Sequence, residues 1–265
     1  MNKIPKIIHY CWFGGNEKPD IVKKCMQSWK KFLPEYKFME WNESNFDVNE
    51  IPYTKQAYEQ KKYAFVSDYV RLVALKKYGG VYIDTDVEIL KPLDKFLNDD
   101  VFCGFESENG VAPGLIFGCI QGHEFIDELL KYYENNDFID KYGVINTYTT
   151  VNNCTDCLLK RGLVLDLNKQ QNLNGIMVYP KAVFCPSLEE RETRNFSGNT
   201  YTVHYYSATW MSKKEKNKQT NIFAKTLRKI GALSGKALKN FLGEEKWSHI
   251  RNKYFKRLYN YMRGI

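Results

Sequence analysis

Two carboxylates stand one residue apart in this chain, at Asp84 and Asp86, directly after the apolar residues 81–83. Side chains at positions i and i+2 can both face one cation where the backbone bends at the end of a strand, and oxygen ligands favour a hard ion such as Mg²⁺ or Mn²⁺. Such an ion could bridge a diphosphate and stabilise charge on a leaving group. A polar strand end whose acids face solvent is the alternative, but Gly79, Gly80 and the apolar strand favour the metal site.

A second pair of charged residues, Asp68 and Arg71, lies upstream within residues 64–75. A spacing of three places both side chains on one face of a helix. Their neighbours are mostly apolar, and charged groups in such surroundings need a partner when they are buried. The pattern is consistent with a structural ion pair, and also with a carboxylate and a guanidinium that contact the hydroxyl groups of a sugar.

Strands and helices alternate along the segment that contains these residues. Apolar runs bounded by Gly or Pro predict strands, and apolar residues at three- and four-residue spacing predict helices. Asp20 is expected to cap a helix that ends near Phe32, and one long helix is expected from Thr54 to Tyr78. The alternation favours an α/β domain with a mostly parallel sheet. The expected strands are 4–12, 36–41, 81–83, 101–105, 114–120, 176–179 and 201–206, and the later helices are 123–133 and 151–160.

The composition is that of a soluble globular protein. Of the 265 residues, 43% are apolar and 26% are charged, which excludes a disordered or fibrous chain and suits one large domain or a domain with an appendage. The chain contains no run of roughly 18 apolar residues, so no membrane-spanning helix is expected. The N-terminal residues become polar too early to form the apolar core of a signal peptide. The seven cysteines, an odd number, are interpreted as reduced cytosolic thiols.

Positive charge is concentrated near the C-terminus. Residues 213–265 contain 15 Lys or Arg and three acids, a net charge of +12, whereas residues 1–212 contain 24 basic and 28 acidic residues, a net charge of −4. Apolar residues also recur in the tail at three- and four-residue steps, which predicts amphipathic helices. Such helices could dock on an anionic membrane surface, or pack their apolar side on the body and expose a solvated basic face.

Residues 67–86, which contain both charged pairs, resemble the donor-binding core of DxD-containing sugar transferases. The chain is similar to family 32 of the glycosyltransferases, which includes yeast-type mannosyltransferases and many bacterial capsule enzymes. It is also similar to the glucosyltransferase domain of the large clostridial toxins. Residues 4–9 followed by Trp12 match the opening strand of the family, and residues 204–210 resemble its closing segment, so the resemblance covers residues 4–212.

The resemblance implies a Rossmann-like GT-A fold and transfer of a hexose from a UDP-sugar, with Mn²⁺ or Mg²⁺ as cofactor and retention of the anomeric configuration. It implies that Asp84, Asp86 and His204 bind the metal. The toxins have Glu where His204 stands, so this histidine is either a third ligand or a satisfied core residue. The match is weak over residues 106–186, which should build the acceptor side.

The resemblance also implies a set of donor contacts. Trp12 would stack on uracil, and Ser207 and Trp210 would contact the diphosphate. The residues expected to contact the donor are Tyr10, Trp12, Asp68, Arg71, Tyr82, Asp84, Ser207 and Trp210, and those expected to act in catalysis are Asp68, Arg71, Asp84 and Asp86.

These inferences favour a hexosyltransferase acting on a lipid-linked saccharide in bacterial capsule or surface-polysaccharide assembly. Residues 1–212 would be the catalytic domain and residues 213–265 the basic helical tail. The expected partners are the UDP-sugar, the saccharide acceptor and, through the tail, an anionic membrane surface, with no nucleic acid. The expected location is cytoplasmic and peripheral on the inner face of the cell membrane. The alternatives are a toxin-like transferase that modifies protein hydroxyls and a non-enzymatic nucleic-acid-binding protein that uses the basic tail.

Overall fold

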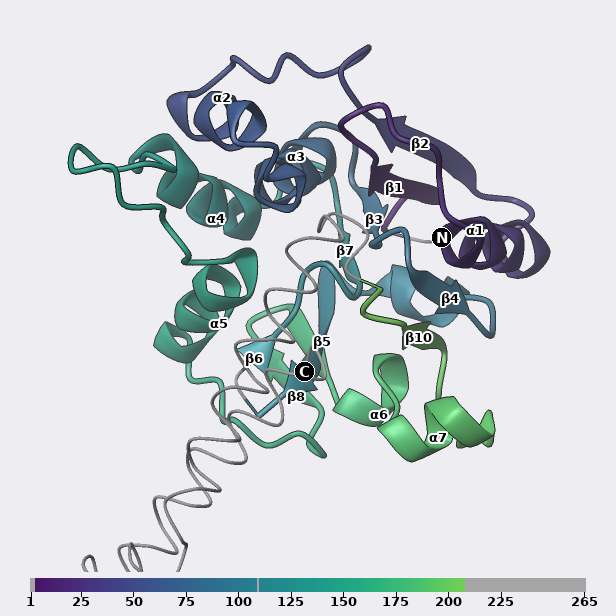
Figure 1. Ribbon diagram of the computed structural model, residues 1–265. Helices are drawn as coiled ribbons and strands as arrows, with labels where there is room; N and C mark the ends of the chain where they lie inside the picture. Colours follow the sequence, from purple (N-terminus) through teal and green to yellow (C-terminus); the bar gives the residue numbers. More distant parts are fainter. Residues whose placement is uncertain (1–2, 109, 208–265) are drawn as a thin grey trace, which may run out of the picture. The chain divides into compact units, whose positions relative to one another are not determined.

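An eight-stranded sheet organises the residues that the structure describes, 3–108 and 110–207. In this computed structural model the strand order is β2-β1-β3-β7-β5-β9-β8, with β6 paired to β5 (Figure 1). Strands β2, β1 and β3 are parallel, as are β5 and β9, whereas β7 is antiparallel to both of its neighbours. The α/β class is confirmed, and the sheet is mixed rather than mostly parallel. The strands are β1 Ile7–Cys11, β2 Lys37–Trp41, β3 Gly80–Tyr82, β5 Val101–Ser107, β6 Gly110–Val111, β7 Phe117–Cys119, β8 Gln171–Leu173 and β9 Ile176–Tyr179.

Strand direction explains why residues distant in the sequence meet at one edge of this sheet. Because β7 is reversed between β3 and β5, strand β5 runs in the same direction as β1 and β3. The carboxyl ends of β1, β3 and β5 therefore lie on one edge, the edge at which open α/β sheets bind ligands. Trp12, Asp84 and Glu106 stand at or just beyond these ends.

The centre of β1 carries a buried histidine, His9, which pairs with Met39 of β2 and Tyr82 of β3. The indole N–H of Trp41 donates to Nδ1 at 3.1 Å, so Nε2 carries the ring proton and donates to the Gly79 carbonyl at 2.9 Å. Burial lowers the pKa of His9 to about 4. The fold therefore holds this ring in its neutral form.

The predicted helix over residues 54–78 is two helices, α2 and α3. Lys61, between them, has a φ of 56°, and this left-handed conformation ends α2. The sequence pattern did not reveal the break because aromatic spacing continues across it, and the rings of Tyr58 and Tyr63 pack at 5.4 Å. The helical elements are α1 Asp20–Phe32, α2 Pro52–Glu59, α3 Tyr63–Tyr78, the 3₁₀ turn η1 Asp94–Asn98, α4 Glu124–Glu134, α5 Thr150–Lys160, α6 Lys181–Phe184 and α7 Leu188–Thr193.

Helix α1 covers the predicted residues, but Asp20 is not its cap. Pro19 occupies the N-cap position without a side-chain hydrogen bond, and Asp20 lies in the first turn, where a carboxylate interacts favourably with the helix dipole.

A second sheet of two short strands, β4 Val87–Ile89 and β10 Thr202–His204, lies beside α1 (Figure 1). The strands are antiparallel and place His204 opposite Val87. The indole N–H of Trp29 donates to the Val87 carbonyl at 2.7 Å, and the Ile89 amide donates to the Ser28 hydroxyl at 2.9 Å. These bonds attach the small sheet to α1. The pairing of β10 with β4 brings His204 close to Asp86.

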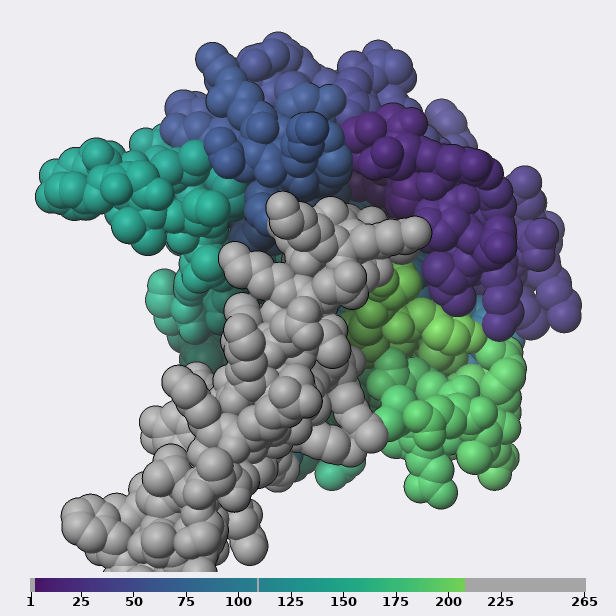
Figure 2. Space-filling model, viewed as in Figure 1, coloured from purple at the N-terminus to yellow at the C-terminus, as the bar shows by residue number. Residues whose placement is uncertain are grey.

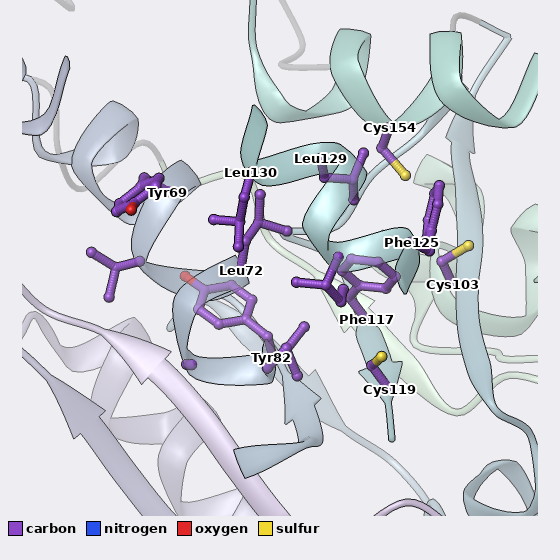
Figure 3. Packing of buried hydrophobic residues seen from close by; sticks show 14 of the residues in the cluster. Tyr69, Leu72, Tyr82, Cys103, Phe117, Cys119, Phe125, Leu129, Leu130 and Cys154 are labelled. Atoms are coloured by element: carbon purple, nitrogen blue, oxygen red, sulfur yellow. The ribbon is translucent and has the colours of Figure 1, made fainter. Parts of the chain in front are cut away.

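Apolar side chains of α3, α4, α5 and the sheet form one core cluster (Figure 3). Tyr69 and Leu72 of α3 lie beside Leu130 of α4, and Phe117 of β7 packs against Phe125 of α4. All seven cysteines are unpaired, as expected, and all are buried. This core makes α3, and with it the Asp68–Arg71 pair, a rigid part of the domain.

Two compact units divide the chain, Met1–Tyr205 and Tyr206–Ile265. The tail helices predicted over residues 213–265 lie outside the described residues, and both they and the boundary at residue 212 stay predictions. Among the described residues, no helix is long and apolar enough to cross a membrane.

Candidate active site

The chain turns sharply after β3 and carries the two predicted metal ligands on the turn. The Asp84 amide donates to the Gly114 carbonyl at 2.8 Å, and the Val87 amide donates to the Asp84 carbonyl at 3.1 Å. Asp84 and Asp86 therefore both lie on a bend of the backbone at the carboxyl edge of the sheet. The bend that the spacing of these two acids requires is present.

Arg71 joins the two charged pairs that the sequence presents separately. Its guanidinium lies 2.9 Å from Asp68 Oδ1 and 3.3 Å from Asp84 Oδ1, and its carbon atom stands 4.7 Å from the centre of the Tyr82 ring. The Tyr82 hydroxyl donates to the same Asp84 oxygen at 3.1 Å. The side chains of Arg71 and Asp68 are 5% and 11% exposed, whereas that of Asp84 is 32% exposed. Asp84 is thus the open member of the cluster, and the ion pair lies beneath it.

Helix α5 contributes to the same cluster through its N-terminus. The amide of Thr150, the first residue of α5, donates to Asp68 Oδ2 at 3.2 Å. Burial raises the pKa of Asp68 to about 6, although the Arg71 guanidinium and this amide both favour the carboxylate. Burial also raises the pKa of Asp84. A cation bound beside Asp84 would relieve the cost of holding these negative charges in a buried place.

The second predicted carboxylate, Asp86, lies against His204. The imidazole stands between two carboxylates, with Nε2 at 3.1 Å from Asp86 Oδ1 and Nδ1 at 3.2 Å from Glu106 Oε1. Burial alone would lower the pKa of His204, but the charges and hydrogen bonds of Asp86 and Glu106 raise it well above its ordinary value. Sequence reasoning missed Glu106. Its signal was its place near the end of β5, whose carboxyl end shares the edge with Asp84.

The donor set fits a divalent ion that shares its ligands with a phosphate. Within residues 3–108 and 110–207, no group of three or more His, Cys, Asp or Glu side chains is placed to hold a metal ion. Mg²⁺ is commonly bound through one or two carboxylates, with substrate phosphates and water in the remaining positions. Asp84 and Asp86 match that arrangement. The role of His204 as a ligand stays a prediction, since both of its ring nitrogens face carboxylates here.

Gly114 is a further part of the site that the sequence did not single out. A Cβ at this position would lie 2.3 Å from Asp84 Oδ2 and 3.0 Å from its Cγ. Only the absence of a side chain at residue 114 lets the Asp84 carboxylate occupy its position.

The remaining predicted donor residues make other contacts or lie beyond the first compact unit. Tyr10 is 7% exposed and packs against Trp29 of α1 with ring centres 5.2 Å apart. Trp12 follows β1, is partly exposed and donates its indole N–H to the Asn16 carbonyl at 2.7 Å. Ser207 belongs to the second unit and Trp210 lies outside the described residues. Their roles stay predictions.

Comparisons with known proteins bear on this site. Residues 19–103 match the family of the glycosyltransferase sugar-binding region containing a DXD motif. Over 132 residues the chain is 30% identical to inositol phosphoceramide mannosyltransferase 3 of Schizosaccharomyces pombe, which covers 48% of this chain and 36% of that protein. Over 152 residues it is 32% identical to mannosyl phosphorylinositol ceramide synthase SUR1 of Saccharomyces cerevisiae. That alignment covers 56% of this chain and 38% of the relative. The chain thus spans less than two fifths of the length of these relatives.

Among solved structures, the PaToxG glycosyltransferase is similar, with 18% identity and a TM-score of 0.48 over 59% of this chain and 69% of that one. The family match covers the turn after β3 and the helix that carries the buried ion pair. The resemblance of this chain to DXD-containing glycosyltransferases is therefore confirmed over residues 19–103, the segment that holds Asp68, Arg71, Asp84 and Asp86.

Proposed function

We propose that the protein transfers a hexose from a UDP-sugar to an acceptor hydroxyl with retention of the anomeric configuration. The observation that carries this proposal is the single cluster in which Arg71 bridges Asp68 and Asp84 next to Asp86 and His204. Mg²⁺ or Mn²⁺ bound at Asp84 and Asp86, with His204 as a further candidate ligand, would neutralise charge on the departing diphosphate.

The side chains of this site supply position and charge rather than a covalent intermediate. The Arg71 guanidinium, fixed by two carboxylates, is a buried positive charge beneath the open carboxylate of Asp84. Asp68 and Arg71 are proposed to orient the hexose. In the transfer, the bond from the anomeric carbon to the diphosphate oxygen breaks. The acceptor oxygen bonds to the same face of that carbon, and its proton passes to the diphosphate.

The donor nucleotide is proposed to lie along the carboxyl ends of β1 and β3. Trp12 follows β1 there and is partly exposed, which suits a ring that stacks on uracil. Tyr10, Tyr82, Ser207 and Trp210 would complete the donor contacts.

The acceptor is proposed to be a lipid-linked saccharide of bacterial capsule or surface-polysaccharide assembly. The names of two fungal relatives, an inositol phosphoceramide mannosyltransferase and a mannosyl phosphorylinositol ceramide synthase, refer to ceramide lipids. These names support a lipid-borne acceptor. The net charge of +12 over residues 213–265 supports docking on anionic lipid at the inner face of the cell membrane.

Donor hydrolysis without acceptor tests the central proposal. The full chain is incubated with UDP-glucose, UDP-galactose, UDP-N-acetylglucosamine or GDP-mannose, with Mn²⁺ or with excess EDTA. We expect metal-dependent release of UDP from one UDP-hexose, lowered by about 100-fold or more in Asp86→Asn. Asp99→Asn is the matched control, because Asp99 lies just before β5, at the opposite edge of the sheet, where it accepts from the Tyr179 hydroxyl at 2.9 Å.

Full turnover in EDTA, or a near wild-type rate in Asp86→Asn, would refute the metal site. Release of GDP from GDP-mannose alone would correct the donor nucleotide. Salt-sensitive oligonucleotide binding without turnover of any donor would favour the nucleic-acid-binding alternative instead.

A further inference from the structure

The small sheet of β4 and β10 is too short to maintain its own register. Each strand contains three residues, and an isolated pair of strands is marginal in water even when the strands are longer. This sheet nevertheless positions two residues of the site, because Asp86 directly precedes β4 and His204 ends β10 opposite Val87. Other contacts must therefore fix the two strands against each other.

Three side chains form such a contact, here called the Glu88 cluster: Glu88 of β4, Arg194 directly after α7, and Tyr205 directly after β10. The two terminal nitrogens of Arg194 each lie 3.0 Å from a different oxygen of Glu88. Arg194 also donates to the Tyr205 hydroxyl at 2.8 Å, and that hydroxyl donates to Glu88. The Glu88 side chain is 9% exposed and that of Arg194 is 47% exposed. A two-pronged bond between guanidinium and carboxylate fixes orientation as well as distance.

Two further hydrogen bonds connect the backbone at His204 and Tyr205 to Asp86 and to α7. Tyr205 directly follows His204, and its amide donates to the Asp86 carbonyl at 3.1 Å. Arg191 of α7 donates to the His204 carbonyl at 2.9 Å. Residues 188–204, which contain α7 and β10, lie beside α1 and β4 on one face of the body (Figures 1 and 2). The backbone that carries the His204 ring is thus bonded to α7.

We propose that Arg194 is a positioning residue that sets the metal and diphosphate geometry through the Glu88 cluster. This inference rests on the proposed function of the site. Arg194 contacts Glu88 and Tyr205 rather than the proposed metal ligands. It holds Tyr205 and Glu88, and these hold Asp86 and His204 in register. Groups that orient metal ligands from behind commonly change metal affinity by about 10- to 100-fold when they are removed.

Binding of Mn²⁺ to the full chain in the presence of saturating UDP tests the proposal without turnover. The free Mn²⁺ signal in electron paramagnetic resonance gives the apparent Kd. We expect Arg194→Gln to raise this Kd by about 10-fold or more. Arg194→Lys should rescue part of the loss, because lysine keeps the charge but makes a single contact.

Arg161→Gln is the matched control. Arg161 forms an ion pair with Glu128 that links α5 to α4, and it lies on neither strand of the small sheet. Melting temperatures of the two glutamine variants show whether both are folded. If Arg194→Gln does not fold, Tyr205→Phe removes one hydroxyl from the cluster and should raise the Kd by about five-fold.

An unchanged Mn²⁺ affinity in folded Arg194→Gln or in Tyr205→Phe would overturn the inference. An equal rise in Arg161→Gln would also overturn it, because the effect would then be nonspecific. A wild-type chain that binds no Mn²⁺ with UDP would overturn the proposed function as well. Intact wild-type binding with unaffected variants would reject the role of Arg194 alone.

Discussion

Replacing Gly114 with alanine should disable the site while leaving the fold largely intact. The added methyl carbon would lie 2.3 Å from Asp84 Oδ2, whereas ordinary contacts of a Cβ begin near 3.4 Å. The Asp84 carboxylate must therefore move by about 1 Å from the position in which it contacts Arg71 and Tyr82. A misplacement of that size at a reacting centre can cost about 100-fold in rate, which corresponds to ~2.7 kcal/mol of activation free energy.

The cost to stability should be small, because Asp84 is 32% exposed and can turn toward solvent. We expect the free energy of unfolding to fall by ~1 kcal/mol, the low end for overpacking, and the melting temperature by about 2–4 °C.

Gly118 of β7 provides the matched control. A Cβ there would lie 1.9 Å from Cε1 of Phe102, a ring that is fully buried and has no route to solvent. Gly118→Ala should therefore lose ~3 kcal/mol or more of stability while the folded fraction keeps its specific activity. The assays are donor hydrolysis at several Mn²⁺ concentrations and thermal unfolding of both variants. Wild-type hydrolysis by Gly114→Ala would refute the assignment of Asp84 to the site.

Three further outcomes are expected. Acid should lower the free energy of unfolding by ~2 kcal/mol between pH 6.5 and 5, because His9 takes up a proton in the unfolded chain but stays neutral in the folded chain until the pH approaches its lowered pKa of about 4. Urea titrations of His9→Gln should not show this loss. Asp68→Ala should lower the free energy of unfolding at pH 7 by ~3 kcal/mol in a denaturant titration, because Arg71 loses its closer partner and keeps Asp84. If Asp68 also contacts the sugar, turnover of the hexose donor should fall, while calorimetry should show a nearly unchanged UDP affinity. The full chain should pellet with anionic vesicles at low salt, and a chain without residues 213–265 should stay in the supernatant.

Local patterns predicted the elements whose signals are local. The helix expected from Asp20 to near Phe32 coincides with α1, and the run over residues 176–179 coincides with β9. The acids after β3 could be recognised because the strand, the glycines before it and the carboxylates all lie within a few residues. The break between α2 and α3 was missed because it depends on one backbone conformation, at Lys61, that no side-chain pattern encodes.

Local patterns do not predict contacts between distant segments, and only the family resemblance placed His204 together with Asp86. His204 meets Asp86 across 118 residues and Glu106 across 98 residues, and both contacts depend on the antiparallel placement of β7 and on the pairing of β4 with β10. The Asp68–Arg71 pair was predicted as a unit, but its bond to Asp84 required α3 to pack over the end of β3. A single sequence contains no signal for such register between segments.

The buried, unpaired cysteines make the domain a reporter of its own local opening. A thiol reagent can react only when a segment opens, so the labelling rate of each cysteine measures the free energy of opening at its position. Cys11 lies at the end of β1 beside the site, and burial raises its pKa to about 12, whereas Cys154 of α5 lies deep in the core. Mass spectrometry of labelled peptides could therefore follow, without any engineered probe, whether a bound sugar nucleotide tightens the site alone or the whole domain.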